Sequence, residues 1–544
     1  MKLNKTRNIF FTGFMASGKS RIGALTAASL GWKFFDTDKL VEEKTGKTIP
    51  QIFAEQGEAA FRKLELETLR EICASGQMVA SLGGGTLLNP EAIELIRKNG
   101  VLIGLRASPE VILERVNRKK ESRPLLADLD DPAKLEKIKS MLAERQPLYD
   151  LANFQFESEE SLPHHVFTRR IIHRLLVEEL DPLWVELGER RYPIYIGEDL
   201  SDYIDSIAEK TGCPQSFAVV SDQNVQDAQG SMLEHLRTAL GNCPAFYWKS
   251  GEPEKNLTSI QKLLTWLLRQ GFSRKSVLVA CGGGVVGDMT GFAASIFLRG
   301  IPFIQVPTTL LSMVDSSVGG KTGVNHPLGK NLIGAFHQPR AVIISLNSLK
   351  TLPREQYLAG LAEVVKYAII RDMEFFAWLE QNADAVAQQD MGALQYIVRR
   401  SCAIKAAVVG NDEREMDERG RAVLNYGHTF GHAFENLSEY RYPHGLAVAL
   451  GMRCAARLSG SLGMLSAQDV IRHDALLDRL NLPRHFSNAF DMDKAFEAMS
   501  RDKKASSGRR VFIVPKSLGE AVPVVNPPED AVRDAFKVVL GDHG

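Results

Sequence analysis

The sequence lacks an excess of charge of either sign, and it lacks any long hydrophobic run. Its 544 residues carry 66 Lys and Arg against 66 Asp and Glu, so the formal net charge is zero. Without a basic tail or a polybasic block, nothing in the composition indicates binding to nucleic acid or to a membrane surface. No apolar run reaches the roughly 20 residues that a membrane helix needs. We therefore expect small-molecule substrates, with neither nucleic acid nor a membrane as partner.

Cysteine is scarce and scattered. The six cysteines include no C-x-x-C pair, and in a chain of this length they indicate reduced thiols. The N-terminal apolar stretch is short and continues directly into a glycine loop, which is not typical of a signal peptide. We therefore predict a cytoplasmic protein. The chain is too long for one core, so about three domains are expected.

The first clear motif lies near the N-terminus. A short apolar strand at residues 8–12 precedes G-x-x-x-x-G-K-S at residues 13–20, and a helical pattern begins at Ile22. In this context backbone N–H groups cradle phosphates, Lys19 reaches the β- and γ-phosphates, and the Ser20 hydroxyl binds Mg²⁺. The motif predicts a P-loop that binds the phosphates of a nucleotide together with Mg²⁺.

Two carboxylates, Asp36 and Asp38, follow a second strand. At the end of a strand beside a phosphate loop they suit Mg²⁺ binding and the positioning of a hydroxyl, although such a pair alone also suits a helix N-cap. Arg62 lies in a helical pattern, where a solvated position is the default. A third strand closes in the glycines of residues 83–85.

Together these motifs resemble shikimate kinase over nearly all of residues 1–178. The resemblance implies phosphorylation of shikimate to shikimate 3-phosphate by ATP with Mg²⁺. It implies that shikimate contacts Asp38, Arg62, Gly84 and Arg145, that Asp36 helps to bind Mg²⁺, and that Arg123 is a lid arginine over ATP. It also implies catalytic roles for Lys19, Asp38 and Arg123, with Asp38 placed to accept a proton. The loop residues implied at the nucleotide and its metal are Ala16, Ser17, Gly18, Lys19, Ser20 and Arg21.

A linker is predicted at residues 179–190. A helical pattern at residues 166–176 precedes the helix-breaking Asp181-Pro182, and a new strand begins at residue 191. Strands and helices then alternate to about residue 345, which is typical of an α/β sheet. Residues 346–544 are predicted to be mainly helical.

The second unit is organised around residues 277–334. An apolar strand at residues 277–280 ends in the glycines of residues 282–284. Glycines there let backbone N–H groups approach a pyrophosphate, although the spacing is not G-x-G-x-x-G and a tight strand-to-helix turn is the alternative. Asp315, Lys321, Lys330 and Asn331 follow in a stretch rich in small residues, which suits a phosphate or carboxylate ligand.

Two constellations lie in the helical part. Glu363 and Lys366 are three residues apart and therefore share a helix face. Four polar residues spaced 4, 3 and 4 predict one stripe on one helix, and a histidine follows in a turn: Arg421, Asn425, His428, His432 and His444. Two histidines on such a stripe, a third nearby and a helical glutamate form a plausible metal set, although a lone histidine is more often structural.

These residues resemble 3-dehydroquinate synthase over the whole second unit. The resemblance implies conversion of 3-deoxy-D-arabino-heptulosonate 7-phosphate to 3-dehydroquinate and phosphate, a lyase reaction in which NAD is not consumed. It implies that Zn²⁺ or Co²⁺ is bound by Glu363, His428 and His444, and that His432 transfers a proton. The implied NAD contacts are Asp222, Asn224, Ser250, Gly251, Glu252, Pro253, Glu254, Lys255, Gly284, Val285, Val286, Gly287, Asp288, Thr308, Thr309, Lys321, Lys330, Ser348, Leu349, Lys350 and Thr351. The implied substrate contacts are Arg299, Asp315, Lys321, Asn331, Lys366, Lys405, Arg421, Asn425 and one of Lys503 and Lys504.

The predicted architecture is therefore α/β: a P-loop kinase domain with a parallel sheet, an α/β NAD-binding domain at residues 191–345, and a mainly helical metal-binding domain. We expect a fused bifunctional enzyme of aromatic amino-acid biosynthesis that forms a homodimer through the synthase unit. Two alternatives remain. A metal- and NAD-dependent polyol dehydrogenase would not need the phosphate-directed Arg299, Lys321 and Asn331. An ATP-sensing regulatory module would not need the intact substrate set of the kinase unit.

Overall fold

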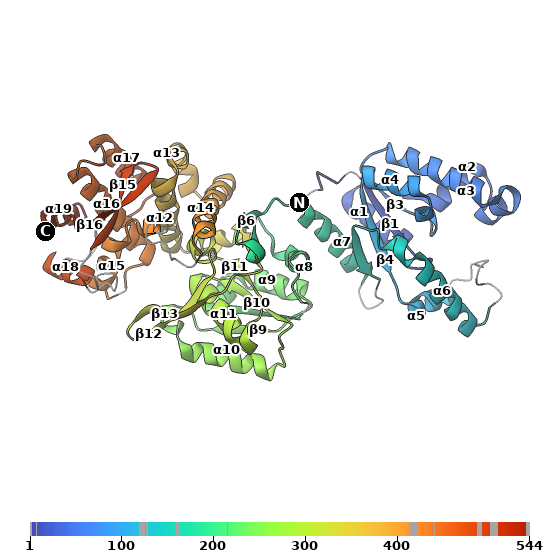
Figure 1. Cartoon of the computed structure of the whole chain (residues 1–544), viewed down its shortest axis with the longest axis horizontal. Helices are drawn as coiled ribbons and strands as arrows, with labels where there is room; N and C mark the ends of the chain where they lie inside the picture. Colours follow the sequence, from blue (N-terminus) through green and yellow to red (C-terminus); the bar gives the residue numbers. More distant parts are fainter. Residues whose placement is uncertain are drawn as a thin grey trace. The chain divides into compact units, whose positions relative to one another are not determined.

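The chain forms two compact units, Met1–Leu180 and Asp181–Gly544, in the computed structural model (Figure 1). The structure describes residues 3–6, 8–118, 126, 129–158, 163–214, 216–413, 422–439, 441–486, 492–500 and 510–539. Each unit has its own sheet and its own hydrophobic core. The first unit ends two residues after the predicted boundary at residue 178.

The first unit is built on a five-stranded parallel sheet with the order β2-β3-β1-β4-β5. Its strands are β1 Asn8–Gly13, β2 Lys33–Asp36, β3 Met78–Ser81, β4 Val101–Arg106 and β5 Phe154–Glu157. All six residues of the central strand β1 are buried, as expected for a parallel sheet that helices cover on both faces. The carboxyl ends of β1, β2 and β3 therefore lie side by side at one edge of the sheet.

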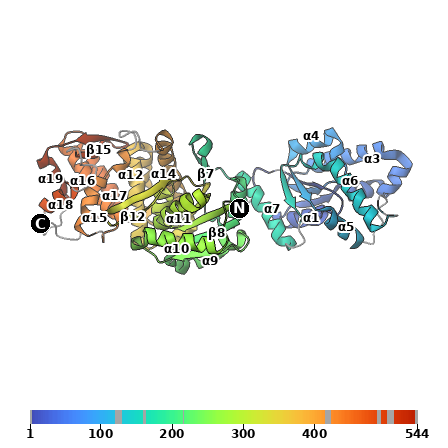
Figure 2. The same ribbon diagram turned by 60° about the horizontal axis from the view of Figure 1, so that its bottom comes forward.

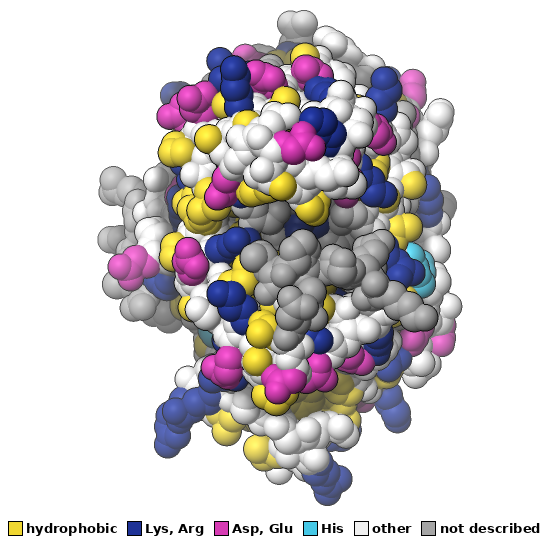
Figure 3. All heavy atoms as spheres, turned by 90° about the vertical axis from the view of Figure 1, so that its right-hand side faces the viewer, with side chains coloured by type: hydrophobic (Ala, Val, Ile, Leu, Met, Phe, Trp, Pro, Cys, Tyr) yellow, Lys and Arg dark blue, Asp and Glu magenta, His cyan; other side chains and the backbone are white. Residues whose placement is uncertain are grey.

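In the described part of this unit seven helices accompany the sheet: α1 Lys19–Leu30, α2 Thr37–Thr45, α3 Ile49–Cys73, α4 Pro90–Asn99, α5 Pro109–Arg118, α6 Asp131–Tyr149 and α7 His164–Glu179. A short 3-10 turn, η1 Thr86–Leu88, follows β3. Within α3, Gly57 has φ 79°, so the backbone kinks there and the second half of the helix carries Arg62. On the face shown in Figure 3, basic and acidic side chains are interspersed, in keeping with the zero net charge.

The second unit begins with a seven-stranded sheet of order β6-β7-β14-β11-β10-β8-β9. Its strands are β6 Leu183–Val185, β7 Tyr192–Gly197, β8 Ser216–Asp222, β9 Ala245–Trp248, β10 Ser276–Gly282, β11 Phe303–Pro307 and β14 Ala341–Ser345. All pairs are parallel except β6 with β7. Residues 183–185, which we predicted as part of a linker, thus form an edge strand, and the fully buried Val185 joins the core.

Four helices and a hairpin complete this α/β part: α8 Ile204–Lys210, α9 Gln223–Ala239, α10 Leu257–Arg269 and α11 Gly284–Ile296, with the hairpin strands β12 Lys321–His326 and β13 Gly329–Phe336. The hairpin is a separate two-stranded sheet that packs on α11. In the views of Figures 1 and 2 it extends toward the helical group that contains α15.

The helical part comprises α12 Arg354–Arg371, α13 Met373–Ala387, α14 Met391–Asn411, α15 His428–Leu437, α16 His444–Ser461, α17 Ala467–Arg479, α18 Met492–Ser500 and α19 Glu529–Lys537, with the hairpin strands β15 Val511–Ser517 and β16 Glu520–Val525. Helices α12 and α16 are buried over most of their length and pack against each other. Among the described residues, no helix is both long enough and apolar enough to cross a membrane.

The join between the two units is anchored on each side. Glu179, the last residue of α7, accepts hydrogen bonds from the backbone N–H groups of Asn4 (2.7 Å) and Thr6 (2.8 Å). Asp181 accepts one from Arg399 of α14 at 2.7 Å. Leu180 is thus the single residue between an anchor in the first unit and an anchor in the second.

Candidate active sites

The phosphate loop of the first unit connects β1 to α1. Ala16 (φ 60°) and Gly18 (φ 100°) adopt left-handed backbone conformations that let the loop curl. The ammonium of Lys19 donates hydrogen bonds to the carbonyl oxygens of Gly13 (2.8 Å) and Phe14 (3.0 Å), so it lies across the loop. This is the cradle of backbone N–H groups and a lysine that suits a polyphosphate.

Asp36 and Asp38 lie beside this loop, at the end of β2. Asp36 caps α2, because its carboxylate accepts a hydrogen bond from the backbone N–H of Lys39 at 3.4 Å. In the structure Asp36 therefore makes the helix N-cap contact that we gave as the alternative to binding Mg²⁺. Ser20 Oγ is 3.2 Å from Ser81 Oγ at the end of β3. The carboxyl ends of three neighbouring strands therefore meet at the loop.

The environment of Asp38 is unusual for a carboxyl group. Burial raises its pKa to about 6, assisted by the negative charges of Glu65 and Asp36, while Lys19 and Arg62 act in the opposite direction. A carboxylate with a pKa near working pH is suited to accept a proton from a substrate hydroxyl.

Residues 83–85 form the turn around which the predicted shikimate contacts gather. Arg145 Nη1 donates to Gly84 O at 3.4 Å. A Cβ on Gly83 would lie 2.5 Å from Asp38 Oδ1, and one on Gly85 would lie 2.3 Å from Arg62 Nη2. A side chain at Gly83 or Gly85 would therefore displace the ends of Asp38 and Arg62. The structure thus brings Asp38, Arg62, Gly84 and Arg145 together.

Three further residues at this site were not predicted. Glu65 is buried and pairs with Arg62 at 2.8 Å. Tyr149 Oη donates to Gly84 O at 3.1 Å. Arg115 Nη1 donates to the phosphate-loop carbonyl of Ala16 at 3.3 Å. Of these three residues, only Glu65 could have been predicted from the sequence, because it lies three residues after Arg62 in a helical pattern. Of the predicted residues, Arg21 is exposed on α1, Ser17 is buried, and Arg123 lies outside the described residues.

The metal candidates of the second unit come from three helices. Glu363 lies in the middle of α12, His428 at the start of α15 and His444 at the start of α16. One ligand atom from each lies within 4.8 Å of the others. His428 Nε2 is 3.8 Å from Glu363 Oε1. The structure therefore brings the three predicted ligands together.

The chemistry of these donors fits a divalent cation. Glu363 is 1% exposed, and neither of its carboxylate oxygens accepts a hydrogen bond from the described residues, although the Lys366 ammonium forms an ion pair with it. Burial, together with the charges of Lys366, His444 and His432, lowers the pKa of His428 well below its usual value. The Tyr426 carbonyl oxygen, 3.1 Å from Nδ1 of His428, can only accept. Nδ1 therefore carries the hydrogen, and Nε2 offers its lone pair toward Glu363.

The single polar stripe predicted for this region is wrong. Asn425 ends a separate 3-10 turn, η8 Ala422–Asn425, and α15 begins only at His428. Gly427 between them has φ 77°, and a Cβ there would lie 2.8 Å from Val448 O of α16. The close approach of α15 to α16 thus requires a left-handed glycine that breaks the helix. Arg421 lies outside the described residues.

The glycine cluster of the second unit forms a strand-to-helix turn between β10 and α11. A Cβ on Gly287 would lie 2.7 Å from Gln305 Oε1, and one on Gly284 would lie 3.0 Å from Ser316 Oγ. Thr308 N donates to Gly282 O at 3.0 Å, which joins this turn to the end of β11. The turn keeps backbone N–H groups accessible at the carboxyl ends of parallel strands, where a dinucleotide binds in open α/β sheets.

Hydrogen bonds link the other predicted NAD residues along the same edge. Lys255 Nζ donates to Asp288 Oδ2 and to Asn331 Oδ1, both at 2.6 Å. Asn224 N donates to Ser250 Oγ at 2.8 Å. Asp222 is the N-cap of α9, and its carboxylate accepts a hydrogen bond from the backbone N–H of Val225 at 3.0 Å. The 3-10 turn η7 Leu346–Thr351 follows β14. Gln229 Nε2 donates hydrogen bonds to Ser348 O and to Thr351 Oγ1 in this turn.

Asp315 lies in a π-helical turn, η6 Ser312–Ser316, between the α/β and helical parts. Its carboxylate accepts hydrogen bonds from Lys405 Nζ (2.6 Å) and from the unpredicted Tyr367 Oη (2.7 Å). Burial alone would raise the pKa of Asp315, but Lys405, Lys366 and the Tyr367 hydroxyl hold it well below its usual range. This carboxylate is therefore a fixed negative charge.

Arg299 does not join the polar contacts around Asp315 within the described residues. It lies exposed in the turn η5 Phe297–Arg299 with φ 72°, after Leu298 with φ 48°, and makes no hydrogen bond or ion pair within the described residues. Lys321 is exposed at the start of β12. Lys503 and Lys504 lie outside the described residues.

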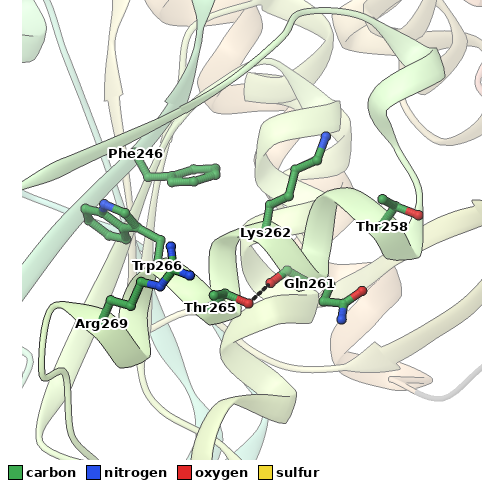
Figure 4. Close-up of a pocket in the computed structure, with 7 residues that line it drawn as sticks. All are labelled: Phe246, Thr258, Gln261, Lys262, Thr265, Trp266 and Arg269. Atoms are coloured by element: carbon green, nitrogen blue, oxygen red, sulfur yellow. Dashed lines mark hydrogen bonds between the residues drawn. The ribbon is translucent and has the colours of Figure 1, made fainter.

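A separate groove of about 430 Å³ runs along α10 beside the edge strand β9. Figure 4 shows the rings of Phe246 and Trp266 at one end, with Lys262 and Arg269 among the helical side chains. None of its lining residues is a histidine, cysteine or carboxylate. The groove therefore lacks the side chains that usually bind a metal ion.

Comparison with known proteins assigns both units. The family models for the 3-dehydroquinate synthase N-terminal and C-terminal domains match residues 245–359 and 360–505, and the model for shikimate kinase matches residues 15–176. The 3-dehydroquinate synthase of Syntrophotalea carbinolica is 44% identical over 362 residues, which are 66% of this chain and 99% of the relative. The chain belongs to the 3-dehydroquinate synthase family. Its N-terminal unit is a shikimate kinase, so the predicted kinase–synthase fusion is confirmed.

Other relatives agree with this assignment. The 3-dehydroquinate synthase of Pseudoalteromonas atlantica is 46% identical, and the match covers 64% of this chain and 98% of the relative. The structure of 2-deoxy-scyllo-inosose synthase complexed with carbaglucose-6-phosphate, NAD⁺ and Co²⁺ is 25% identical, with a TM-score of 0.61 over 66% of this chain and all of that one. A 2-epi-5-epi-valiolone synthase from Streptomyces hygroscopicus with NAD⁺ and Zn²⁺ bound is also 25% identical, with a TM-score of 0.58 over 64% and 96% of the two chains. The predicted fold class is confirmed, and the chain is a bifunctional shikimate-pathway enzyme rather than a polyol dehydrogenase or an ATP sensor.

Proposed function

We propose that the synthase unit binds NAD and one divalent cation, Zn²⁺ or Co²⁺, at Glu363, His428 and His444. The observation that carries this proposal is the cluster of Glu363, His428 and His444, whose ligand atoms all lie within 4.8 Å of one another, with Nε2 of His428 directed toward the buried Glu363 carboxylate. When bound, the cation supplies a Lewis acid for a substrate oxygen and NAD supplies a hydride acceptor.

The surrounding side chains bind and orient the substrate. The substrate, 3-deoxy-D-arabino-heptulosonate 7-phosphate, carries a carboxylate and a phosphate, and the cations of Lys366 and Lys405 suit these groups. His432, on α15 one turn after His428, is 41% exposed at its side chain. It is therefore within reach of solvent and substrate for proton transfer, while Asp315 holds Lys405 in place.

In the kinase unit, ATP with Mg²⁺ would lie on the phosphate loop, and Ser20 and Asp36 would bind the cation. Lys19 neutralises charge on the transferred phosphoryl group, because phosphoryl transfer depends mainly on alignment and electrostatic stabilisation. Arg62 and Arg145 bind the shikimate carboxylate, and Asp38 accepts the proton of the attacking hydroxyl. The kinase does not act on the product of the synthase, so direct transfer between the two sites is not implied.

Removal of the metal from the full-length protein tests this assignment. We expect elemental analysis to find one Zn²⁺ or Co²⁺ per chain. A chelator that spares Mg²⁺ should remove it, abolish phosphate release by the synthase, and leave shikimate phosphorylation unchanged. Full synthase activity in metal-free protein would refute the proposed site.

We further propose a cytoplasmic homodimer formed through the synthase unit. Five large apolar side chains are exposed between the end of α11 and the β12–β13 hairpin: Ile296, Leu298, Leu328, Leu332 and Phe336. We propose that these side chains form the dimer interface, because large exposed apolar side chains gain stability when a partner covers them. The six cysteines are free thiols, as expected in a reducing compartment. Sedimentation should give a dimer for the wild type and a monomer for Leu332→Asp/Phe336→Asp; an unchanged sedimentation coefficient would contradict this interface.

A further inference from the structure

A buried glutamate, Glu435 of α15, lies between the metal candidates and the NAD-binding part. Its side chain is 6% exposed. One carboxylate oxygen is 3.3 Å from His444 Nδ1 and 4.0 Å from His432 Nε2, and the other is 3.3 Å from the Lys330 ammonium. Three elements, α16, α15 and β13, thus converge on one side chain that the sequence did not single out.

This carboxylate is buried and paired on two sides, with His444 and with the Lys330 ammonium. A charged group that is buried and paired on two sides is costly to move. It therefore fixes the partners on either side of it.

The contact with His444 decides which ring nitrogen faces the metal ligands. The Glu435 carboxylate accepts a hydrogen bond from His444, so Nδ1 of His444 carries a hydrogen and Nε2 is the nitrogen that a metal ion would bind. His444 belongs to two overlapping groups of potential metal ligands. The first group is Glu363, His428 and His444, and the second is His432, Glu435 and His444. An ion held by the first group leaves Glu435 as the hydrogen-bond partner of a ligand. Such partners orient the imidazole and raise its basicity.

The contact with Lys330 reaches into the other part of the unit. Lys330 belongs to β13, in the hairpin that packs on α11 and extends toward α15 (Figures 1 and 2). Asn331, the next residue, accepts a hydrogen bond from Lys255, which also pairs with Asp288 of α11. Polar contacts therefore run from the metal histidine through Glu435 to Lys330, and from the adjacent Asn331 through Lys255 to Asp288 of α11, which follows the glycine turn.

We propose that Glu435 is a positioning residue that couples the metal site to the NAD site, because one carboxylate orients His444 and also holds Lys330 of the NAD-binding hairpin. This inference rests on the proposed metal and NAD sites. A ligand that changes the contacts of Glu435 at one site therefore changes the ligand affinity of the other site. The coupling must be the same in both binding free energies.

Two binding measurements on the full-length protein test the coupling without an activity assay. Competition with a chromogenic chelator gives the Zn²⁺ affinity, which should fall about tenfold in Glu435→Gln and toward about 100-fold in Glu435→Ala, the range for lost partners of metal-bound histidines. Titration calorimetry gives the Kd of NAD⁺ with and without Zn²⁺. The ratio of the two Kd values should be about fivefold or more in the wild type and close to one in Glu435→Gln.

Glu439→Gln is the matched control, because this glutamate follows the same helix and its side chain is 81% exposed. It should keep both the Zn²⁺ affinity and the NAD⁺ ratio of the wild type. Unchanged values in the two Glu435 variants would overturn the proposal. Loss of Zn²⁺ from His432→Ala as well would also overturn it, because Glu435 and His432 would then be ligands themselves. A wild type that binds neither Zn²⁺ nor Co²⁺ would instead refute the proposed metal site.

Discussion

The two active sites of this chain are assembled in different ways. The kinase site collects turns that follow β1, β2 and β3, and the carboxyl ends of parallel strands lie at one edge of the sheet regardless of how the helices pack. The synthase site takes its metal candidates from α12, α15 and α16, which meet only because buried helices pack closely. Sheet topology thus places the first site, and core packing places the second.

The same residue type also has opposite environments in the two sites. In the kinase, Asp38 is half-buried near Glu65 and Asp36, and its pKa is raised to about 6. In the synthase, Asp315 contacts Lys405 and Tyr367, and its pKa is well below the usual range. The first carboxylate is suited to exchange a proton near neutral pH, and the second is suited to remain a fixed charge.

The largest expected effect separates the two sites completely. His444→Ala leaves two metal ligands from the protein, so we expect loss of bound metal and of all measurable synthase activity. Kinase activity should not change, because its residues come from another compact unit. Elemental analysis beside both assays gives the result. Retained metal would show that His444 is not a ligand.

Lys19→Ala is the reciprocal test. Removing a cation that stabilises charge in the transition state should lower shikimate kinase kcat about 10³-fold or more, with the synthase unaffected. Lys39→Ala, an exposed lysine of α2, is the control and should keep wild-type activity. Loss of both activities in a folded Lys19 variant would contradict two independent sites.

His432→Ala distinguishes proton transfer from metal binding within the synthase. We expect kcat to fall about 10²–10⁴-fold, as for a lost acid–base group, while the metal content stays at the wild-type value. If His432→Ala loses the metal and His444→Ala keeps it, the two histidines have exchanged roles.

Arg145→Ala tests the substrate side of the kinase. A charge-assisted contact contributes about 1.5–3 kcal/mol, so the KM for shikimate should rise roughly tenfold or more while the KM for ATP changes little. Arg62→Ala should behave alike. Steady-state kinetics with each substrate varied separately gives the comparison, and an effect on ATP alone would exclude a contact with shikimate.

The smallest effect concerns pH. Asp38 acts as a base only when ionised, so kinase kcat/KM for shikimate should rise with pH through about 6, the pKa of its carboxyl group. Glu65→Gln removes a negative charge that raises this pKa, so the inflection should move to lower pH. Glu58→Gln is the control: Glu58 also pairs with Arg62 but is not among the charges that shift Asp38. An inflection that stays in place in Glu65→Gln would exclude Asp38 as the titrating group.

Spacing along one element was the most informative signal in the sequence. The phosphate loop, the pairing of Glu363 with Lys366 and the strand-to-helix turn at residues 282–284 depend on neighbours a few positions apart, and the structure contains all three. The prediction of one helical stripe was wrong because Gly427 breaks the helix where α15 packs against α16. The spacing of residues along one element does not reveal how two helices pack together. Tyr367 and Arg115 were missed for the same reason: their polar contacts lie 52 and 99 residues away in the chain.

The anchored join suggests where the gene can be divided. Glu179 holds the N-terminal segment through Asn4 and Thr6, and Asp181 holds Arg399, so a cut after Leu180 leaves each polypeptide with its own clamp. A cut at residue 178 would leave Asn4 and Thr6 without their acceptor and would add an unpaired glutamate to the other half. With a single residue between the clamps, proteases have little extended chain to bind, so we expect limited digestion to cleave elsewhere before it separates kinase from synthase.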